Sequence, residues 1–157
     1  MAEASIGILQ QRRIEAGVIK PLLREMEKEL GRDKARAILE RVIRELALES
    51  GRALAAQAKE PTLTAFAALK EPWLRHGALE IDVLEASDER YAFNVTRCRY
   101  AEMYRELGLG DLGYQLSCGR DRMLIEGFNP ELQLTRTQTI MEGASFCDFR
   151  YARRNRD

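Results

Sequence analysis

The chain has 157 residues, 45% hydrophobic and 32% charged, and its 25 basic and 25 acidic side chains give a formal net charge of zero. This length and balance are typical of one soluble globular domain. Binding to nucleic acid or to an anionic membrane normally needs a basic surplus, so neither partner is expected. No apolar run approaches the roughly 20 residues that span a bilayer, and the first residues lack a secretory pattern, so a cytoplasmic protein is expected.

The first half of the chain predicts amphipathic helices. A first helix is expected to end at Gly31, with Pro21 near its start because a proline costs least there. Asp33 is the expected N-cap of a second helix over residues 34–58, and a third, shorter helix is expected over 62–70. The first helix has apolar residues at helical spacing: Ile19, Leu22, Leu23, Met26 and Leu30.

The second half changes to the period of β-strands. Alternating residues over 79–83 and 91–95 predict a hairpin, and a short helix is expected over 98–107. Two further strands are expected over 132–140 and 145–152. The sequence therefore predicts an α+β fold, in which an antiparallel sheet of about four strands packs against an N-terminal helical layer. We expect a single domain over 1–157, with the helical layer in 1–76 and the sheet in 77–157.

All three cysteines lie in the last third of the chain. An odd number of cysteines in a chain without a secretory signal argues against a disulfide framework, so free thiols are expected. A thiolate is a strong nucleophile, and strand alternation separates Cys147 from its neighbour Asp148. Cys118 precedes Asp121 by three residues, which on a helix places both on one side. Cys98 is expected to be a small buried residue. Cys118 and Cys147 are each expected to be either a buried core residue or a nucleophile.

A zinc site is the rival interpretation of the same thiols. Three cysteines with a carboxylate or with His76 would complete a tetrahedral set. The cysteines are separated by 20 and 29 residues, and no pair has the close spacing of zinc ligands. We therefore expect no metal and no cofactor. His76, the single histidine, is expected at a cap or at the surface, and Glu142 is either a general base or a plain turn residue.

Five short motifs in this region resemble one family. They are T-R-C-R-Y (96–100), G-Y-Q-L-S-C-G-R-D (113–121), G-F-N-P (127–130), R-T-Q-T-I-M-E-G (136–143) and C-D-F-R-Y (147–151). In order and spacing they are similar to the L-2-amino-thiazoline-4-carboxylic acid hydrolase family. The resemblance implies hydrolysis of a non-peptide carbon–nitrogen bond in a small cyclic amidine or cyclic amide, such as a thiazoline that bears a carboxylate.

The resemblance also implies a set of site residues. Cys118 is the implied nucleophile, with Cys147 as an equal alternative, and Asp121 and Glu142 are the implied proton-handling or orienting groups. Three arginines are implied candidates for binding the substrate carboxylate: Arg97, Arg136 and Arg150. The reaction needs a nucleophile, an acid for the leaving ring atom and a cation for the carboxylate. The alternative is a non-enzymatic sensor module that binds a small molecule or zinc.

The expected partners are few. The resemblance implies a small heterocyclic substrate. The amphipathic helix over 34–58 and the edge strands of a small sheet favour a homo-oligomer.

Overall fold

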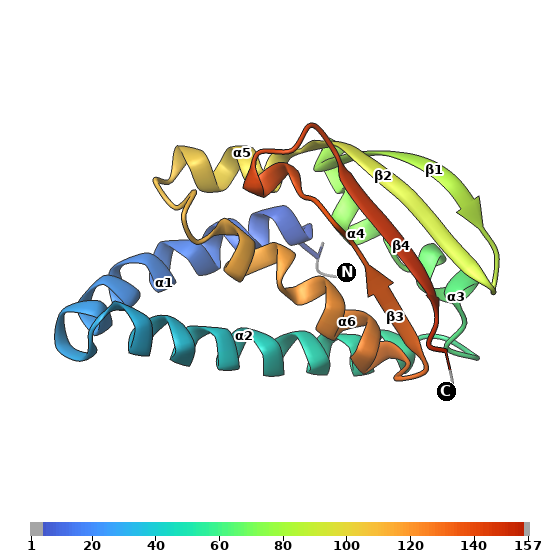
Figure 1. The fold of residues 1–157 in the computed structure, drawn as a ribbon, viewed down its shortest axis with the longest axis horizontal. Coiled ribbons are helices and arrows are strands. Elements are labelled where there is room, and N and C mark those ends of the chain that lie inside the picture. Colours follow the sequence, from blue (N-terminus) through green and yellow to red (C-terminus); the bar gives the residue numbers. More distant parts are fainter. Residues whose placement is uncertain (1–4, 156–157) are drawn as a thin grey trace.

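The computed structural model describes residues 5–155 and consists of helices packed against one four-stranded antiparallel sheet, in the order β1-β2-β4-β3 (Figure 1). The helices are α1 (Ile8–Leu30), α2 (Arg32–Ala55), α3 (Leu63–Ala68), α4 (Glu71–Leu74), α5 (Arg99–Glu106) and α6 (Arg120–Phe128). The strands are β1 (Leu79–Ala86), β2 (Arg90–Cys98), β3 (Leu132–Thr135) and β4 (Cys147–Arg153). The predicted α+β fold is confirmed. Within this part of the chain, no helix has the length and apolar character that crossing a membrane requires.

The two long helices, α1 and α2, form an antiparallel hairpin (Figure 1). Gly31 ends α1 with a φ of 82°, as predicted, because glycine adopts this conformation without strain. Asp33 lies in the first turn of α2 and not at its N-cap, so that prediction was wrong. Pro21 lies inside α1, which begins at Ile8, and its placement near the start was also wrong. An internal proline costs about 3 kcal/mol; tertiary packing along α1 outweighs this cost.

The helix predicted over 62–70 is α3, and a further short helix, α4, which the sequence did not predict, follows it. α3 ends at Ala68, and α4 follows with Pro72 in its first turn, where a missing N–H is tolerated. Thr62 caps α3, because its side chain accepts a hydrogen bond from the backbone N–H of Ala65. The break between the two helices places Lys70 at the N-cap of α4.

The sheet presents one aromatic face to the helices. Phe93 on β2 stacks on Phe149 on β4, with ring centroids 4.8 Å apart and planes 11° apart. Such pairs contribute about 0.5–1.5 kcal/mol beyond the burial of their area. The predicted alternation along β4 is confirmed, since Cys147, Phe149 and Tyr151 are all buried. Cys147 faces Val95 in the register of β2 and β4, beside the aromatic stack.

β1 departs from the expected alternation. Its register against β2 shifts between Glu80 and Ile81 and again between Val83 and Glu85. A bulge changes the side to which the following residues point. Val83, which alternation with Leu79 predicted to be buried, directly precedes the second shift and is 53% exposed.

β3 is shorter than the strand predicted over 132–140. It ends at Thr135, because the backbone N–H groups of Thr137 and Gln138 donate to the carboxylate of Asp148 instead of to a neighbouring strand. The chain then turns through a short 3-10 helix, Ile140–Glu142. This early end of β3 leaves Arg136 buried between the strand and the helices.

α2 and α6 pack side by side with their backbones in direct contact (Figure 1). A Cβ atom at Gly51 would meet the backbone carbonyl oxygen of Leu124, and a Cβ at Gly127 would meet that of Leu48. Both glycines are therefore required by the close approach of the two helices. This contact sets the position of α6, which carries Arg120 and Asp121.

We predict that Gly127→Ala lowers the free energy of unfolding by about 1–3 kcal/mol, because the added methyl group forces α6 away from α2. Gly17→Ala is the matched control. Gly17 also lies inside a helix, but a Cβ there meets nothing within 4 Å. The control should stabilise the protein by about 0.5–1 kcal/mol. Urea unfolding measures both, and equal stability of the two variants would contradict the packing argument.

Candidate functional site

A cavity of about 80 Å³ lies between the helical layer and the sheet, and we call it the central cavity. One water needs only about 10–15 Å³ of such space, so the cavity has room for several waters or a small ring. Its walls combine apolar side chains, among them Trp73 and Phe149, with chemically active ones. The polar and thiol-bearing wall residues are Arg12, Ser50, Cys98, Tyr100, Ser117, Cys118, Arg120, Asp121, Arg136 and Cys147.

All three cysteines line this cavity as free thiols. Burial is the main cause that raises their pKa values, to about 11 for Cys98 and well above the ordinary range for Cys118. Burial also raises the pKa of Cys147. The sulfur of Cys98 accepts a hydrogen bond from the N–H of Ala101 at 3.4 Å, and that of Cys147 accepts one from Ile140 at 3.2 Å. At neutral pH the three groups are therefore thiols, not thiolates.

Asp121 and Arg136 form a buried ion pair in the cavity wall. Nη1 of Arg136 donates to Oδ2 of Asp121 at 2.6 Å, and Nη2 donates to the carbonyl oxygen of Cys118 at 3.0 Å. The guanidinium also lies 4.9 Å from the ring centroid of Phe149, a cation–π contact. Burial raises the pKa of Asp121, while Arg136 opposes that rise. The carboxyl is thus a stronger base than an exposed aspartate.

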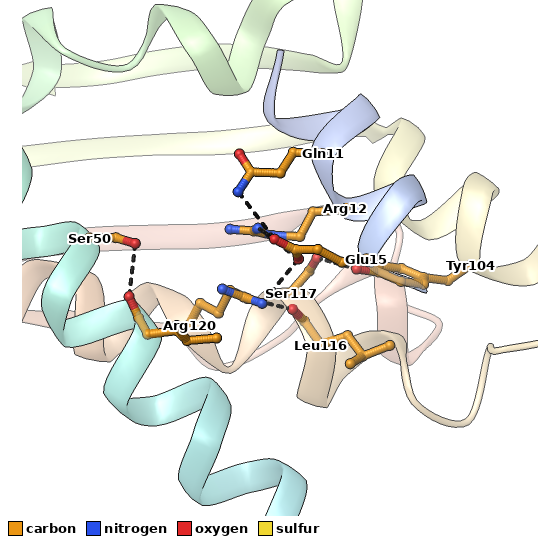
Figure 2. Close-up of polar contacts among 9 residues, drawn as sticks. Gln11, Arg12, Glu15, Ser50, Tyr104, Leu116, Ser117 and Arg120 are labelled. Carbon is orange, nitrogen blue, oxygen red and sulfur yellow. Dashed lines mark hydrogen bonds and ion pairs between the residues drawn. The ribbon is translucent and has the colours of Figure 1, made fainter. Parts of the chain in front are cut away.

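Arg12 and Arg120 form a second buried group at the α1 side of the cavity (Figure 2). Both donate to the carboxylate of Glu15, at 3.0 Å and 3.3 Å. Nε of Arg120 also donates to the carbonyl oxygen of Leu116 at 2.7 Å. Burial, followed by the charge of Arg12, lowers the pKa of Arg120 to about 10. Two guanidiniums thus share one carboxylate.

The cavity therefore has an excess of positive charge. Three buried guanidiniums, those of Arg12, Arg120 and Arg136, face the two carboxylates of Glu15 and Asp121. An unbalanced buried cation is costly unless an anion accompanies it. The arrangement thus favours a ligand that carries a negative charge.

Three of the residues implied by the resemblance lie elsewhere. Glu142 is exposed, and its carboxylate accepts a hydrogen bond from Thr139 at 2.7 Å. Arg97 pairs at the surface with Glu102 at 3.0 Å. Arg150 donates across the sheet to the carbonyl oxygen of Phe93 at 2.9 Å. None of the three lines the central cavity.

The structure brings the other implied residues together. Cys118, Cys147, Asp121 and Arg136 all line the one cavity. His76 is exposed, in a turn where its φ is 58°. Across residues 5–155, no three histidine, cysteine or acidic side chains are grouped so that they would hold a metal ion.

Sequence reasoning did not select Arg12 or Arg120 as ligand-binding residues. The sequence signal that could have identified Arg12 is its helical spacing from Ala16 and Leu23, since all three lie on the buried face of α1. A charged residue on an apolar face is unusual and is generally paired. Arg120 lies within the S-C-G-R-D motif, beside Asp121. Only the three-dimensional contact with Glu15 shows that the two arginines act together.

Two solved structures match this chain over most of its length. The first is the phenol-responsive sensory domain of the transcription activator PoxR with phenol, at 12% identity and a TM-score of 0.52, over 87% of this chain and 73% of that one. The second is a trafficking protein particle complex subunit 3 from Naegleria fowleri covalently bound to palmitic acid, at 10% identity and a TM-score of 0.46, over 92% of this chain and 96% of that one. A comparison with curated proteins found no match.

A family model gives the identification. The model of the L-2-amino-thiazoline-4-carboxylic acid hydrolases matches residues 11–151, which include every wall residue of the central cavity except Ile8. The match therefore covers both the helical layer and the sheet. The chain belongs to the L-2-amino-thiazoline-4-carboxylic acid hydrolase family.

Proposed function

We propose that this protein hydrolyses a carbon–nitrogen bond in a small cyclic amidine or cyclic amide that carries a carboxylate. The observation that carries the proposal is the content of the central cavity, where one aspartate, three thiols and three buried arginines surround a space for a small ring. The family takes its name from such a molecule, a thiazoline with an amino group and a carboxylate.

Arg12 and Arg120 are the proposed binding groups for the substrate carboxylate. They share a single carboxylate, that of Glu15, so an incoming anion supplies the charge that the group lacks. A hydrogen bond between charged groups contributes about 1.5–3 kcal/mol. Arg136 already has its partner, Asp121, so its role is to hold that carboxyl in place.

Asp121 is the proposed general base. One oxygen, Oδ2, accepts the hydrogen bond from Arg136, which leaves Oδ1 for the reaction. Asp121 takes a proton from water as the water oxygen bonds to the amidine carbon. Asp121 passes this proton to the ring nitrogen, and the remaining hydroxyl proton follows it as the carbon–nitrogen bond breaks, so that the nitrogen leaves as an amine and the oxygen becomes a carbonyl oxygen. The step consumes one water molecule and involves no oxidation.

The thiols have a less direct role in this scheme. Because burial keeps Cys118 and Cys147 protonated, a water molecule activated by Asp121 is the favoured nucleophile. The nucleophilic role that the resemblance implies for either cysteine stays a prediction. Cys118 is the better candidate of the two, since the sulfur of Cys147 already accepts a hydrogen bond from Ile140.

A small-molecule sensor is the second candidate function. The fold is that of a sensory domain which was solved with phenol, and the central cavity has room for a ring of similar kind. A sensor would bind a cyclic amidine without turnover. The predicted homo-oligomer stays a prediction under either function, and light scattering of the purified protein measures it.

Asp121 gives the first prediction for activity. The proposal expects kcat/KM for L-2-amino-thiazoline-4-carboxylate to fall as the pH is lowered through the raised pKa of Asp121, because the protonated carboxyl cannot accept a proton. The midpoint should lie above the ordinary value of 3.8. Asp121→Asn should lower kcat by roughly 10²–10⁴-fold. A variant that binds the substrate and retains full kcat would eliminate Asp121 as the base.

The cysteines give a second prediction. If water is the nucleophile, Cys118→Ser and Cys147→Ser should each keep kcat within about tenfold of the original protein, a change of about 1.4 kcal/mol in the barrier. A covalent thiol mechanism expects a loss of several orders of magnitude in one of them. Single-turnover assays with mass spectrometry would show whether an adduct forms on either sulfur. Such an adduct would overturn the water mechanism.

The arginines give a third prediction. Arg12→Gln should raise KM for the carboxylate substrate by roughly 10–100-fold, the effect of one charged hydrogen bond. It should change KM for 2-amino-thiazoline, which lacks the carboxylate, by less than about threefold, well below the effect of such a bond. Arg13→Gln is the control, because Arg13 is the exposed neighbour and pairs with Glu106 at the surface. An equal effect on both substrates would show that Arg12 does not bind the carboxylate.

A further inference from the structure

Lys70 directs its amine into a group of five aromatic rings, which we call the aromatic cage. Nζ lies 3.6 Å from the centroid of the Phe93 ring. The other four centroids are between 5.1 and 5.6 Å away, and they belong to Phe66, Tyr91, Phe149 and Tyr151. The rings come from α3, β2 and β4, so the folded protein surrounds a single amine with them.

The amine has no oxygen acceptor within hydrogen-bond distance. Lys70 bonds to Ala67 and Trp73 through its backbone, but its side-chain amine makes no hydrogen bond and no ion pair within residues 5–155. Rings attract a cation, by about 2 kcal/mol or more when it is desolvated, but they do not replace the water that an ammonium loses. Burial accordingly lowers the pKa of Lys70 to about 7, and the charge of Asp121 only partly opposes this.

The amine also faces free space. A second cavity of about 40 Å³ is lined by Lys70, Asp121 and four rings, those of Phe66, Phe93, Phe149 and Tyr151, with Trp73 beside them. Trp73, Asp121 and Phe149 also line the central cavity, so the two cavities adjoin along one wall. A small molecule in the second cavity lies against apolar surfaces with one amine and one carboxyl within the same walls.

We propose that Lys70 is a reactive amine that captures a small apolar aldehyde or ketone as an imine. The nitrogen lone pair attacks the carbonyl carbon and forms a carbon–nitrogen bond. The nitrogen gives up both of its hydrogens, and the carbonyl oxygen leaves with them as water. Asp121, the carboxyl in the same cavity, passes the protons from nitrogen to oxygen. No oxidant or reductant is needed.

The charges around Lys70 agree with this chemistry. Asp121 on α6 is the single acidic group of the cavity wall. Tyr91 and Tyr151 face the amine from β2 and β4, and burial raises the pKa of each, so both hydroxyls stay neutral. A lysine in apolar surroundings keeps an appreciable fraction of neutral amine at pH 7, which an exposed lysine does not. Lys70 and a carbonyl ligand have no part in the proposed hydrolysis, so capture of the carbonyl does not depend on it, although Asp121 transfers protons in both reactions.

Reductive labelling tests the proposal. The purified protein is incubated with propanal and sodium cyanoborohydride, which reduces an imine to a stable amine, and peptides are analysed by mass spectrometry. At pH 7 we expect Lys70 to be labelled at least roughly tenfold faster than exposed Lys20 and Lys34. The preference should fall at pH 9–10, as ordinary lysines with pKa values of about 10.4 lose their protons. Asp121→Asn should shift the midpoint for Lys70 to lower pH, because the charge that favours the ammonium is gone.

Lys70→Met is the matched variant, since it preserves an unbranched chain within the rings. It should remove the fast label without unfolding the protein, because replacing a buried charge by an apolar group is often neutral or stabilising. A Lys70 that is labelled no faster than Lys20 at pH 7 would overturn the proposal and leave the amine a structural member of the cage. That result would not affect the hydrolysis, which is measured separately by ring opening.

Discussion

The ion pair between Asp121 and Arg136 is the contact on which the site depends. It joins the start of α6 to the segment after β3, across the space between helices and sheet. Arg136 is almost fully buried, so loss of its partner would leave an uncompensated charge at a cost of about 3–5 kcal/mol. The pair also orders the backbone, because Arg136 holds the carbonyl oxygen of Cys118. The position of one thiol and of the reactive carboxyl thus follows from one guanidinium.

The same burial that strengthens the pair keeps the thiols protonated. In a medium of low dielectric constant a charge is favoured only beside an opposite one. Arg136 bonds directly to Asp121 but acts on Cys147 only through its charge, and burial remains the main cause that raises the pKa values of Cys98 and Cys147. A cavity with three cysteines is therefore not by itself a site of thiolate chemistry. Its apolar walls and excess of arginine instead favour recognition of a small anion.

Much of the fold could be predicted because its signals are local. The alternation of Cys147, Phe149 and Tyr151 and the helix over 98–107 depend on near neighbours in sequence. The interior position of Pro21 could not be predicted in this way, because long-range packing outweighs an unfavourable local preference. The end of β3 depends likewise on Asp148, a residue of another strand.

The site could be predicted only in part from the sequence, because it too depends on contacts between distant parts of the chain. The motifs placed Cys118, Asp121 and Arg136 together, and the structure has them in one cavity. The motifs did not show that Arg136 lines the cavity while Arg150 does not. The side chain of Arg150 donates instead to the carbonyl oxygen of Phe93, on the neighbouring strand. A buried cation is recognised by what surrounds it, and those neighbours come from distant parts of the chain.

Asp121 connects the two cavities energetically as well as spatially. Arg136 bonds it directly, and Lys70 acts on it through its charge when protonated. Formation of a neutral imine at Lys70 would remove the charge that the ammonium form carries and would therefore raise the basicity of Asp121. By thermodynamic reciprocity, occupation of either cavity then changes affinity for the other by an equal factor. One carboxylate between two cations is sufficient for this coupling, without any movement of the helices.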